Sequence, residues 1–251
     1  MQQKKTYFIS DVHLGAPALS NNRQRELWFV EWLEQAAADA SAIYLLGDIF
    51  DFWYEYRKVA PRGFVRTLGK IAELTDKGIP VHFFTGNHDI WVYDYLPAET
   101  GVIVHREPLL TQINGKRFFL GHGDGLDPHE KGYLLLKRFF TSKTAQFMFS
   151  RLHPNFAFWI GHKWAKHSRL AKGTEPEVSK GPDFETCVTF AKNYIKTEAV
   201  DYFIFGHRHI MMDEKISSNS RVLILGEWIN YFSYAVFNGE ELQLTQFNNR
   251  L

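Results

Sequence analysis

Seven Asp, Asn and His side chains stand in short polar clusters, each directly after an apolar run. They offer oxygen and nitrogen donors without sulfur, which suits divalent ions such as Mn²⁺, Fe²⁺ or Zn²⁺. Seven donors are too many for one tetrahedral ion, but they suit two ions that share a bridging carboxylate. Two such ions can clamp a phosphoryl group and convert a bridging water to hydroxide at neutral pH. The candidate ligands are Asp11, His13, Asp48, Asn87, His122, His207 and His209.

Each of these residues also has an ordinary structural explanation. Asp48 could cap a helix, Asn87 could occupy a left-handed turn, and a single His beside Gly is commonly a satisfied polar group. The recurrence of five clusters after five apolar runs favours the metal interpretation, because separate turns would not share this arrangement.

Each cluster follows an apolar run, and each of these five runs is predicted to be a short buried strand. Between the runs, apolar residues recur at helical spacing. Residues 20–38 place Leu27, Val30, Leu33 and Ala37 on one face, and residues 64–76 place Leu68, Ile71 and Leu74 on one face. This order predicts an α/β sheet, in which ligands bind beyond the carboxyl ends of the strands. A further strand at 221–225 precedes a hairpin expected to turn at Asn238-Gly239. The five predicted strands are 6–9, 42–46, 81–84, 117–120 and 202–205.

The clusters together resemble the calcineurin-like metallophosphoesterase signature. The matching motifs are Asp11-x-His13, Gly47-Asp48-x-x-Asp51, Gly86-Asn87-His88-Asp89, Gly121-His122 and Gly206-His207-x-His209. The resemblance implies a four-layer α/β/β/α sandwich, expected here as one domain over residues 1–251. It implies one ion held by Asp11, His13, Asp48 and His209, and a second held by Asp48, Asn87, His122 and His207. It also implies that His88 stabilises the transition state or protonates the leaving oxygen, that Asp89 orients His88, and that Asp51 helps to set a ligating histidine.

The residues within and around these motifs resemble one family more closely than the superfamily as a whole. Asp11-Val-His13-Leu14-Gly15, Gly47-Asp48-Ile-Phe-Asp51-Phe-Trp53, His122-Gly123-Asp124-Gly125 and Leu225-Gly226-Glu227-Trp228 resemble the UDP-2,3-diacylglucosamine hydrolases of lipid A synthesis. That resemblance implies cleavage of a pyrophosphate at the α-phosphorus, giving UMP and 2,3-diacylglucosamine 1-phosphate, with Mn²⁺ as the expected metal and Fe²⁺ or Zn²⁺ as alternatives. One difference stands out. Many members carry Arg after the ligand Asn, where this chain has His88.

The stretch from residue 130 to 172 differs in composition and is predicted to be a helical cap. It carries nine Lys or Arg residues against one acidic residue, Glu130, interleaved with Phe, Trp and Met. Cations would bind a pyrophosphate and an apolar trough would bind acyl chains. Aromatic residues at helical spacing can equally form core, and charges a solvated face. The candidate substrate-binding residues are Asn87 and His88 beside the metals and Lys163, Lys166, Arg169 and Lys172 in the cap.

Composition and charge also restrict the partners, the disulfides and the location that can be expected. A net charge of +1 argues against a polyanion-binding protein, so nucleic acid is not an expected partner, and nothing indicates a protein partner. Cys187 is the single cysteine, which excludes an internal disulfide. Residues 1–10 do not resemble a signal peptide and no run could span a membrane, so we expect a cytoplasmic enzyme in peripheral contact with the inner face of the membrane that holds its substrate.

Two alternatives remain open at this stage. One is a metal-dependent phosphoesterase of another class, such as a phosphoprotein phosphatase, cyclic-nucleotide phosphodiesterase or nuclease. A peptide or polymer substrate would need an open groove, and a cap folded away with no apolar cavity near the metals would favour this alternative. A non-catalytic scaffold could keep the fold, but loss of ligands usually accompanies such a change and all seven positions are filled.

Overall fold

Two β-sheets lie face to face in the computed structural model, which describes residues 4–172, 179 and 181–247, with the backbone alone for 166–172. The first sheet has the strand order β11-β10-β1-β2-β3-β4 and the second β5-β6-β7-β9-β8. The first comprises β1 (Lys5–Ile9), β2 (Ala40–Leu46), β3 (Val81–Phe84), β4 (Ile103–His105), β10 (Ser233–Phe237) and β11 (Leu242–Gln246). The second comprises β5 (Leu109–Ile113), β6 (Lys116–Leu120), β7 (Tyr202–Phe205), β8 (Met211–Lys215) and β9 (Arg221–Leu225).

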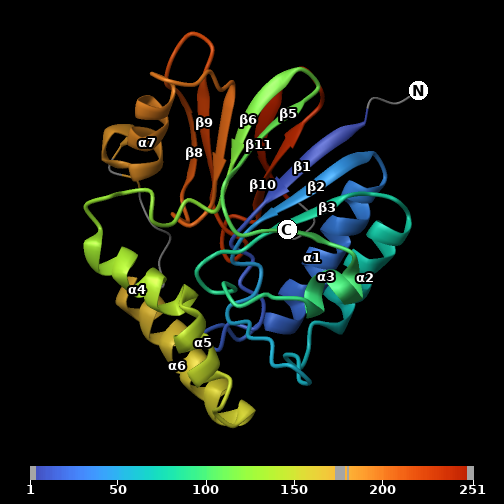
Figure 1. Ribbon diagram of the computed structural model, residues 1–251. Coiled ribbons are helices and arrows are strands. Elements are labelled where there is room, and N and C mark those ends of the chain that lie inside the picture. The colour runs from blue at the N-terminus through green and yellow to red at the C-terminus, as the bar shows by residue number, and fades with distance from the viewer. Residues whose placement is uncertain (1–3, 173–178, 180, 248–251) are drawn as a thin grey trace.

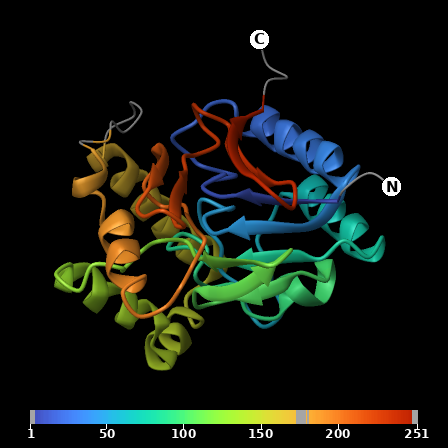
Figure 2. The same cartoon turned by 90° about the horizontal axis from the view of Figure 1, so that it is seen from above.

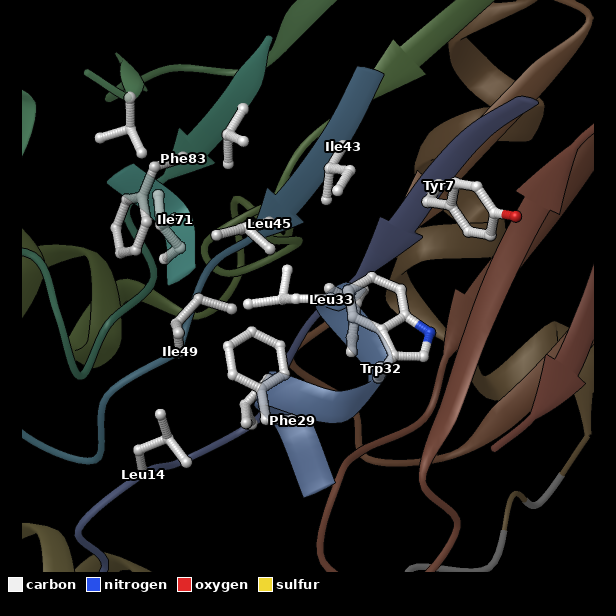
Figure 3. Close-up of a cluster of buried hydrophobic side chains, with 14 of the residues drawn as sticks. Tyr7, Leu14, Phe29, Trp32, Leu33, Ile43, Leu45, Ile49, Ile71 and Phe83 are labelled. Carbon is white, nitrogen blue, oxygen red and sulfur yellow. The ribbon is translucent and has the colours of Figure 1, made fainter. Parts of the chain in front are cut away.

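Helices cover the outer face of each sheet (Figures 1 and 2). On the first sheet lie α1 (Asn22–Ala37), α2 (Val65–Asp76) and α3 (Tyr95–Thr100); on the second lies α7 (Thr186–Tyr194), preceded by a 3₁₀ turn at Pro182–Phe184. Figure 3 shows Phe29, Trp32 and Leu33 of α1 facing the sheet around Ile43 and Leu45. A separate cluster that includes Phe8, Leu46, Phe118 and Ile204 fills the space between the sheets. The expected α/β/β/α layering is therefore confirmed.

The parallel strands β1, β2 and β3 deliver their loops to the same end of the first sheet. Strands β6, β7 and β9 are likewise parallel in the second. β1 also pairs antiparallel with β10, with Thr6 opposite Phe237, so the C-terminal hairpin covers the edge that β1 would otherwise expose. All five predicted strands are present, and β4, β5 and β8 are additional.

The predicted apolar face of α1 is confirmed only in part. The helix buries Leu33 as predicted, together with Phe29, Trp32 and Ala36, whereas Leu27 is 37% exposed, because the aromatic side chains cover more apolar area than the aliphatic stripe. A second local prediction is wrong. The C-terminal hairpin does not turn in two residues. Phe237 pairs with Leu242, which leaves a four-residue loop in which the Asn238 side-chain oxygen accepts hydrogen bonds from the backbone N–H groups of Glu240 and Glu241.

Three helices occupy the predicted cap: α4 (Lys131–Thr141), α5 (Lys143–Phe149) and α6 (Pro154–Lys172). They lie across the strand ends that carry the candidate ligands (Figure 1). An aromatic cluster around Phe52, Tyr54 and Trp91 packs against Phe140 and Phe149 of the cap. Contact with α6 is close at Gly161, where a Cβ atom would lie 2.3 Å from the ring of Phe52. The cap is therefore packed onto the loops of the candidate site.

Candidate metal centre and its cavities

The seven predicted ligands converge from both sheets. Asp11 and His13 follow β1, Asp48 follows β2 and Asn87 follows β3, all in the first sheet; His122, His207 and His209 follow β6 and β7 in the second. Because the carboxyl ends of both sets of parallel strands face the same region, side chains almost 200 residues apart in sequence meet there. Asp11, His13, Asp48 and His122 are almost fully buried.

The backbone at five of the seven ligands adopts a left-handed conformation. Such a φ costs a residue other than Gly of order 1–3 kcal/mol and persists only when its surroundings enforce it. Since β-strands do not use this region, the chain turns at each of these ligands just past the end of its strand, where residues from both sheets meet. The positive φ values belong to Asp11 (53°), His13 (47°), Asp48 (54°), His207 (66°) and His209 (50°).

One group of donors surrounds the first predicted ion position. The Nε2 atoms of His13 and His209 lie 3.1 Å apart, and His209 Nε2 lies 3.2 Å from Asp11 Oδ1. His13 Nε2 is also 3.8 Å from Asp48 Oδ2. Two nitrogens bound to one tetrahedral ion at about 2.1 Å would lie about 3.4 Å apart, close to the spacing of the two histidines.

A second group extends from the same Asp48 oxygen. His122 Nε2 lies 3.4 Å from Asp48 Oδ2 and 3.3 Å from Asn87 Oδ1. Asn87 Oδ1 in turn lies 3.0 Å from His207 Nδ1. Asp48 thus belongs to both groups, as a bridging carboxylate requires.

Contacts on the far side of two imidazole rings indicate which nitrogen faces the cluster. His122 Nδ1 lies 2.9 Å from the backbone carbonyl oxygen of Leu46, which can only accept, so Nδ1 carries a proton. His13 Nδ1 lies 3.4 Å from Asp51 Oδ1, an ion-pair distance. In both rings Nε2 is the atom on the side of the cluster, and a metal ion would displace any proton there.

The electrostatics of the cluster call for cations. Burial opposes ionisation of Asp11 and Asp48, but the neighbouring histidines hold the pKa of both carboxyls below the ordinary range. Burial likewise opposes the charged form of His122, yet Asp48 raises its pKa to about 10. Asp11 Oδ1 is buried and accepts no hydrogen bond from the residues that the structure describes. A buried anionic pair with an unused oxygen fits divalent ions well.

His88 and Asp89 do not act on each other as expected. His88 donates from Nδ1 to the Asp51 carbonyl oxygen at 2.7 Å, and its backbone N–H donates to Asp48 Oδ1 at 2.8 Å. The expectation that Asp89 orients His88 is therefore wrong. The fully buried Asp89 carboxylate instead accepts backbone N–H groups, of Gly86, Asp48, Ile49 and Phe50.

Asp89 thereby joins the Asn87 loop to the Asp48 loop. Burial and the nearby Asp48 raise its pKa to about 7. Its place in the site is structural, because its contacts hold the backbone of a bridging ligand. Asp51, by contrast, lies as expected: its side chain faces His13 and its carbonyl oxygen holds His88.

Arg25 is a positioning residue that sequence reasoning missed. It is fully buried in α1, and its guanidinium donates to the carbonyl oxygens of Val12, His13 and Trp228. The loop that carries Asp11 and His13 is thus fixed to the loop after β9. A single charged residue inside an amphipathic helix gives no sequence signal that it will be buried among carbonyl groups.

Two glycines allow the carboxylates to approach the backbone. A Cβ atom on Gly86 would lie 2.2 Å from Asp48 Oδ1, and one on Gly206 would lie 2.4 Å from Asp11 Oδ2. Neither distance is possible for a real side chain. The Gly before Asn87 and the Gly before His207 are therefore required by the packing of the ligands.

Asn87 of the cluster lines two cavities. The larger, of about 1050 Å³, runs between the site and the cap and is lined by Asn87, His207, Lys137 and Arg208 among others. The smaller, of about 110 Å³, shares Asn87 with it and includes Asp51 and His88. Its other walls are apolar: Phe52, Ile90, Trp91, Phe140, Phe149, Ile160, Gly161, Trp164 and Ala165.

Of the four predicted substrate-binding cations in the cap, the structure describes the side chain of Lys163 alone. Lys163 is exposed, and its ammonium group stacks on the ring of Trp159, 4.9 Å from the ring centre. It lines neither cavity, so a contact with substrate at this position is not supported. The side chains of Lys166, Arg169 and Lys172 lie outside the described residues. Sequence reasoning also missed Lys137, which pairs with Asp124 at 2.7 Å, and Arg208, which pairs with Glu185 at 2.9 Å.

Comparisons with known proteins agree on one family. The calcineurin-like phosphoesterase family matches residues 4–211. A UDP-2,3-diacylglucosamine hydrolase of Porphyromonas gingivalis is 39% identical over 96% of this chain and 97% of its own length. The protein of the same name from Vibrio atlanticus is 28% identical, over 98% and 99%. Among solved structures, the phosphoesterase Yfce of E. coli is 16% identical over 98% of this chain and 95% of its own, with a TM-score of 0.48.

Proposed function

Because this chain belongs to the calcineurin-like phosphoesterase family, we propose that it hydrolyses the pyrophosphate bond of UDP-2,3-diacylglucosamine. The products are UMP and 2,3-diacylglucosamine 1-phosphate. The relatives that carry the name of this activity match nearly the whole chain, cap included. One structural observation carries the proposal beyond the family: apolar cavity walls begin directly beside the metal cluster.

That observation concerns the smaller cavity. Asn87 and His88 line it together with the aromatic side chains of Trp91, Phe140 and Trp164. A phosphate held at the cluster would therefore have an apolar cavity within reach, with room for the first few methylenes of an acyl chain. Each buried methylene contributes about 0.8 kcal/mol, so this part of the chain would add to the affinity.

Two divalent ions, Mn²⁺ in preference to Fe²⁺ or Zn²⁺, would be held by the seven ligands, with Asp48 shared. When bound, they supply Lewis-acid stabilisation of phosphoryl charge and an acidified water at neutral pH. The residues of the chain do the positioning. Arg25 and Asp89 fix the loops that carry Asp11, His13 and Asp48, and Asp51 orients His13.

We assign to His88 the role of acting on the departing oxygen. Its Nδ1 atom is held by the Asp51 carbonyl, which leaves Nε2 to donate or to stabilise developing charge. Its ring lies against His13, 4.9 Å between ring centres, at the wall of the smaller cavity. Lys137 and Arg208 line the larger cavity and could also contact a phosphate, although their ion pairs with Asp124 and Glu185 offset their charge.

The other substrate classes fit this site less well. A polypeptide or nucleic acid needs an open groove, whereas the cap here packs onto the site loops through Phe52, Tyr54 and Trp91. A non-catalytic scaffold has no need to keep five strained ligand backbones. The single-domain organisation with a cap at 130–172 remains part of the proposal.

Contact with the inner face of the cytoplasmic membrane, where a diacylated substrate would reside, follows from the surface of the cap. Phe147, Met148, Phe156 and Trp159 are all more than half exposed and lie on α5 and α6. Aromatic and basic side chains together favour binding at a lipid headgroup region. In the described part of the chain, no helix is long and apolar enough to cross a bilayer.

A hydrolysis assay tests the proposal directly. The Mn²⁺-loaded protein is incubated with UDP-2,3-diacylglucosamine, with UDP-N-acetylglucosamine and with bis-p-nitrophenyl phosphate. We expect rapid release of UMP from the diacylated substrate and little from the unacylated one. Turnover of the generic diester alone would keep the metal chemistry and remove the lipid substrate.

A further inference from the structure

The loop between β6 and the cap carries the motif His122-Gly123-Asp124-Gly125, in which His122 is the predicted metal ligand. Both glycines have a left-handed backbone, with φ values of 104° and 72°. A Cβ atom on Gly125 would lie 3.3 Å from a side-chain carbon of Leu134 on α4, which is a tight contact. The two glycines therefore change the direction of the chain on either side of Asp124 and let it run close against α4.

Asp124 bonds this loop to α4. Its side chain is 6% exposed, and its Oδ2 atom accepts a hydrogen bond from the Tyr133 hydroxyl at 2.6 Å and lies 2.7 Å from Lys137 Nζ. Because Tyr133 and Lys137 are four residues apart, they lie on the same face of the helix. Lys137 Nζ is also 3.4 Å from the Asp124 carbonyl oxygen. Two successive turns of α4 are thus bonded to a residue that stands two positions after a metal ligand.

The contacts of Asp124 differ in kind from three other hydrogen bonds between the cap and the loops of the site. Trp91 Nε1 donates to the carbonyl oxygen of Phe140 at 2.9 Å. The hydroxyls of Tyr54 and Tyr56 donate to carbonyl oxygens further along the cap, at 3.1 and 3.3 Å. These three bonds join neutral groups. A buried carboxylate with a cationic partner forms stronger bonds, and loss of that partner leaves a buried charge uncompensated.

The helix that Asp124 holds forms a wall of the larger cavity beside the metal cluster. The residues of α4 that line this cavity include Tyr133, Leu136, Lys137 and Phe140. The centre of the Tyr133 ring lies 6.2 Å from that of His207, a predicted ligand of the second ion. α4 also packs beside α6 (Figure 1), where the ring centres of Phe140 and Trp164 are 5.7 Å apart. A shift of α4 at Asp124 would therefore change the cavity next to the second group of ligands.

We propose that Asp124 is a positioning residue, which holds α4 against the metal-bearing loop so that the cap wall fits the substrate. It acts through the helix, because its carboxylate is occupied by Tyr133 and Lys137. The identity of the large substrate rests on the proposed function. A substrate that fills the cavity depends on the wall that α4 forms, whereas a small diester reacts at the metals without it. Loss of Asp124 should therefore raise the KM of the large substrate selectively.

D124N tests this assignment, because it keeps the size of the side chain and removes the charge that pairs with Lys137. In the Mn²⁺-loaded protein, we expect KM for UDP-2,3-diacylglucosamine to rise about 10-fold at similar kcat. For bis-p-nitrophenyl phosphate, kcat/KM should change much less, and metal content should match wild type. The control is D127N in the same loop. Its carboxylate accepts a hydrogen bond from the backbone N–H of His129, and it does not line the larger cavity.

Hydrogen–deuterium exchange gives a second measure that is independent of turnover. In D124N, the amides of residues 131–141 should exchange at least about 10-fold faster, whereas those of D127N should match wild type. Y133F removes a single hydroxyl and should act in the same direction, so the proposal can be tested even if D124N fails to fold. Combined with D124N, it should add little further, because both changes act on the same contact.

Exchange in α4 that is the same in D124N and wild type overturns the assignment, and so does an unchanged KM. Loss of bound metal with an equal loss of activity on both substrates also overturns it, since Asp124 would then act on the His122 loop instead of the helix. Faster exchange in α4 without turnover of the UDP-linked lipid by wild type would keep the anchoring of α4 and overturn the proposed function. The two ideas therefore fail separately.

Discussion

His122 Nδ1 lies 2.9 Å from the carbonyl oxygen of Leu46, two residues before the shared carboxylate of Asp48. The end of β2 therefore supplies one ligand and orients another that comes from the opposite sheet. The Asp48 side chain meets the other nitrogen of the same ring, with Oδ2 and Nε2 3.4 Å apart. Small shifts of β2 relative to β6 would alter both ligands together.

Replacing Asp48 should remove both ions. The variant Asp48→Asn keeps the size of the side chain but lacks the charge that two cations share, and loss of a group that merely supports a ligand already costs about 10–100-fold. We expect kcat/KM to fall by more than about 100-fold, with metal content measured by mass spectrometry well below two ions per chain. A variant that retained both ions and full activity would contradict the shared-ligand assignment.

His88 should affect the chemical step without affecting metal binding. Its half-buried side chain donates a hydrogen bond to the Asp51 carbonyl oxygen. His88→Gln is expected to lower kcat about 10²–10⁴-fold, as loss of a general acid does, with metal content preserved. Unchanged kcat would show that another group protonates the leaving oxygen.

Asp89→Asn tests the structural assignment of the neighbouring carboxylate. Asn offers one oxygen to the four backbone N–H groups that Asp89 now binds, so the loops after β2 and β3 should loosen. We expect the free energy of unfolding to fall by about 1–3 kcal/mol in denaturant titrations. Wild-type stability combined with lost activity would instead favour a direct catalytic role.

The exposed aromatic surface of the cap should bind lipid. Changing Phe156 and Trp159, whose rings stack 5.8 Å apart, to Ser should weaken sedimentation with phosphatidylglycerol–phosphatidylethanolamine vesicles at least about 10-fold. The control is Val65→Ser, at an even more exposed apolar residue on α2, outside the cap. Vesicle binding that is the same in all three proteins would remove the membrane contact.

Stability should decrease in mild acid because of His82. Burial, with a smaller effect of His105, lowers its pKa to about 4, below the ordinary histidine value of about 6.5, so the unfolded chain binds a proton that the folded chain excludes. The free energy of unfolding therefore falls as the pH drops from about 6.5 towards about 4, by about 1 kcal/mol for this half-buried group. His82→Phe, which keeps a ring stacked on Tyr44, should flatten that slope. An identical slope would assign the effect to other residues.

The metal ligands could be predicted from sequence because each stands at a strand end, where local pattern and global position coincide. Asp89 could not be assigned correctly in this way. Its partners, such as Ile49 and Phe50, lie about 40 residues away, and only the packing of two loops shows that it binds backbone instead of His88. The buried placement of Arg25 was missed for the same reason.

The cap, too, could be predicted only in part from the sequence. Its helices were predictable from composition, but the direction of each side chain was not. Lys163 was expected at the substrate and instead stacks on Trp159. Asp124 could be recognised only as part of a motif. Its contacts with Tyr133 and Lys137 depend on how α4 docks on the loop after β6.

The pairing of Thr6 with Phe237 has a consequence for synthesis. Strand β1 carries the first two ligands, yet one of its edges is covered only by β10, which the ribosome makes more than 220 residues later. A nascent chain that lacks residues 233–246 would present β1 as an open edge, a template for pairing with other chains. Variants with short C-terminal truncations should therefore aggregate during expression, instead of folding into an enzyme with reduced turnover.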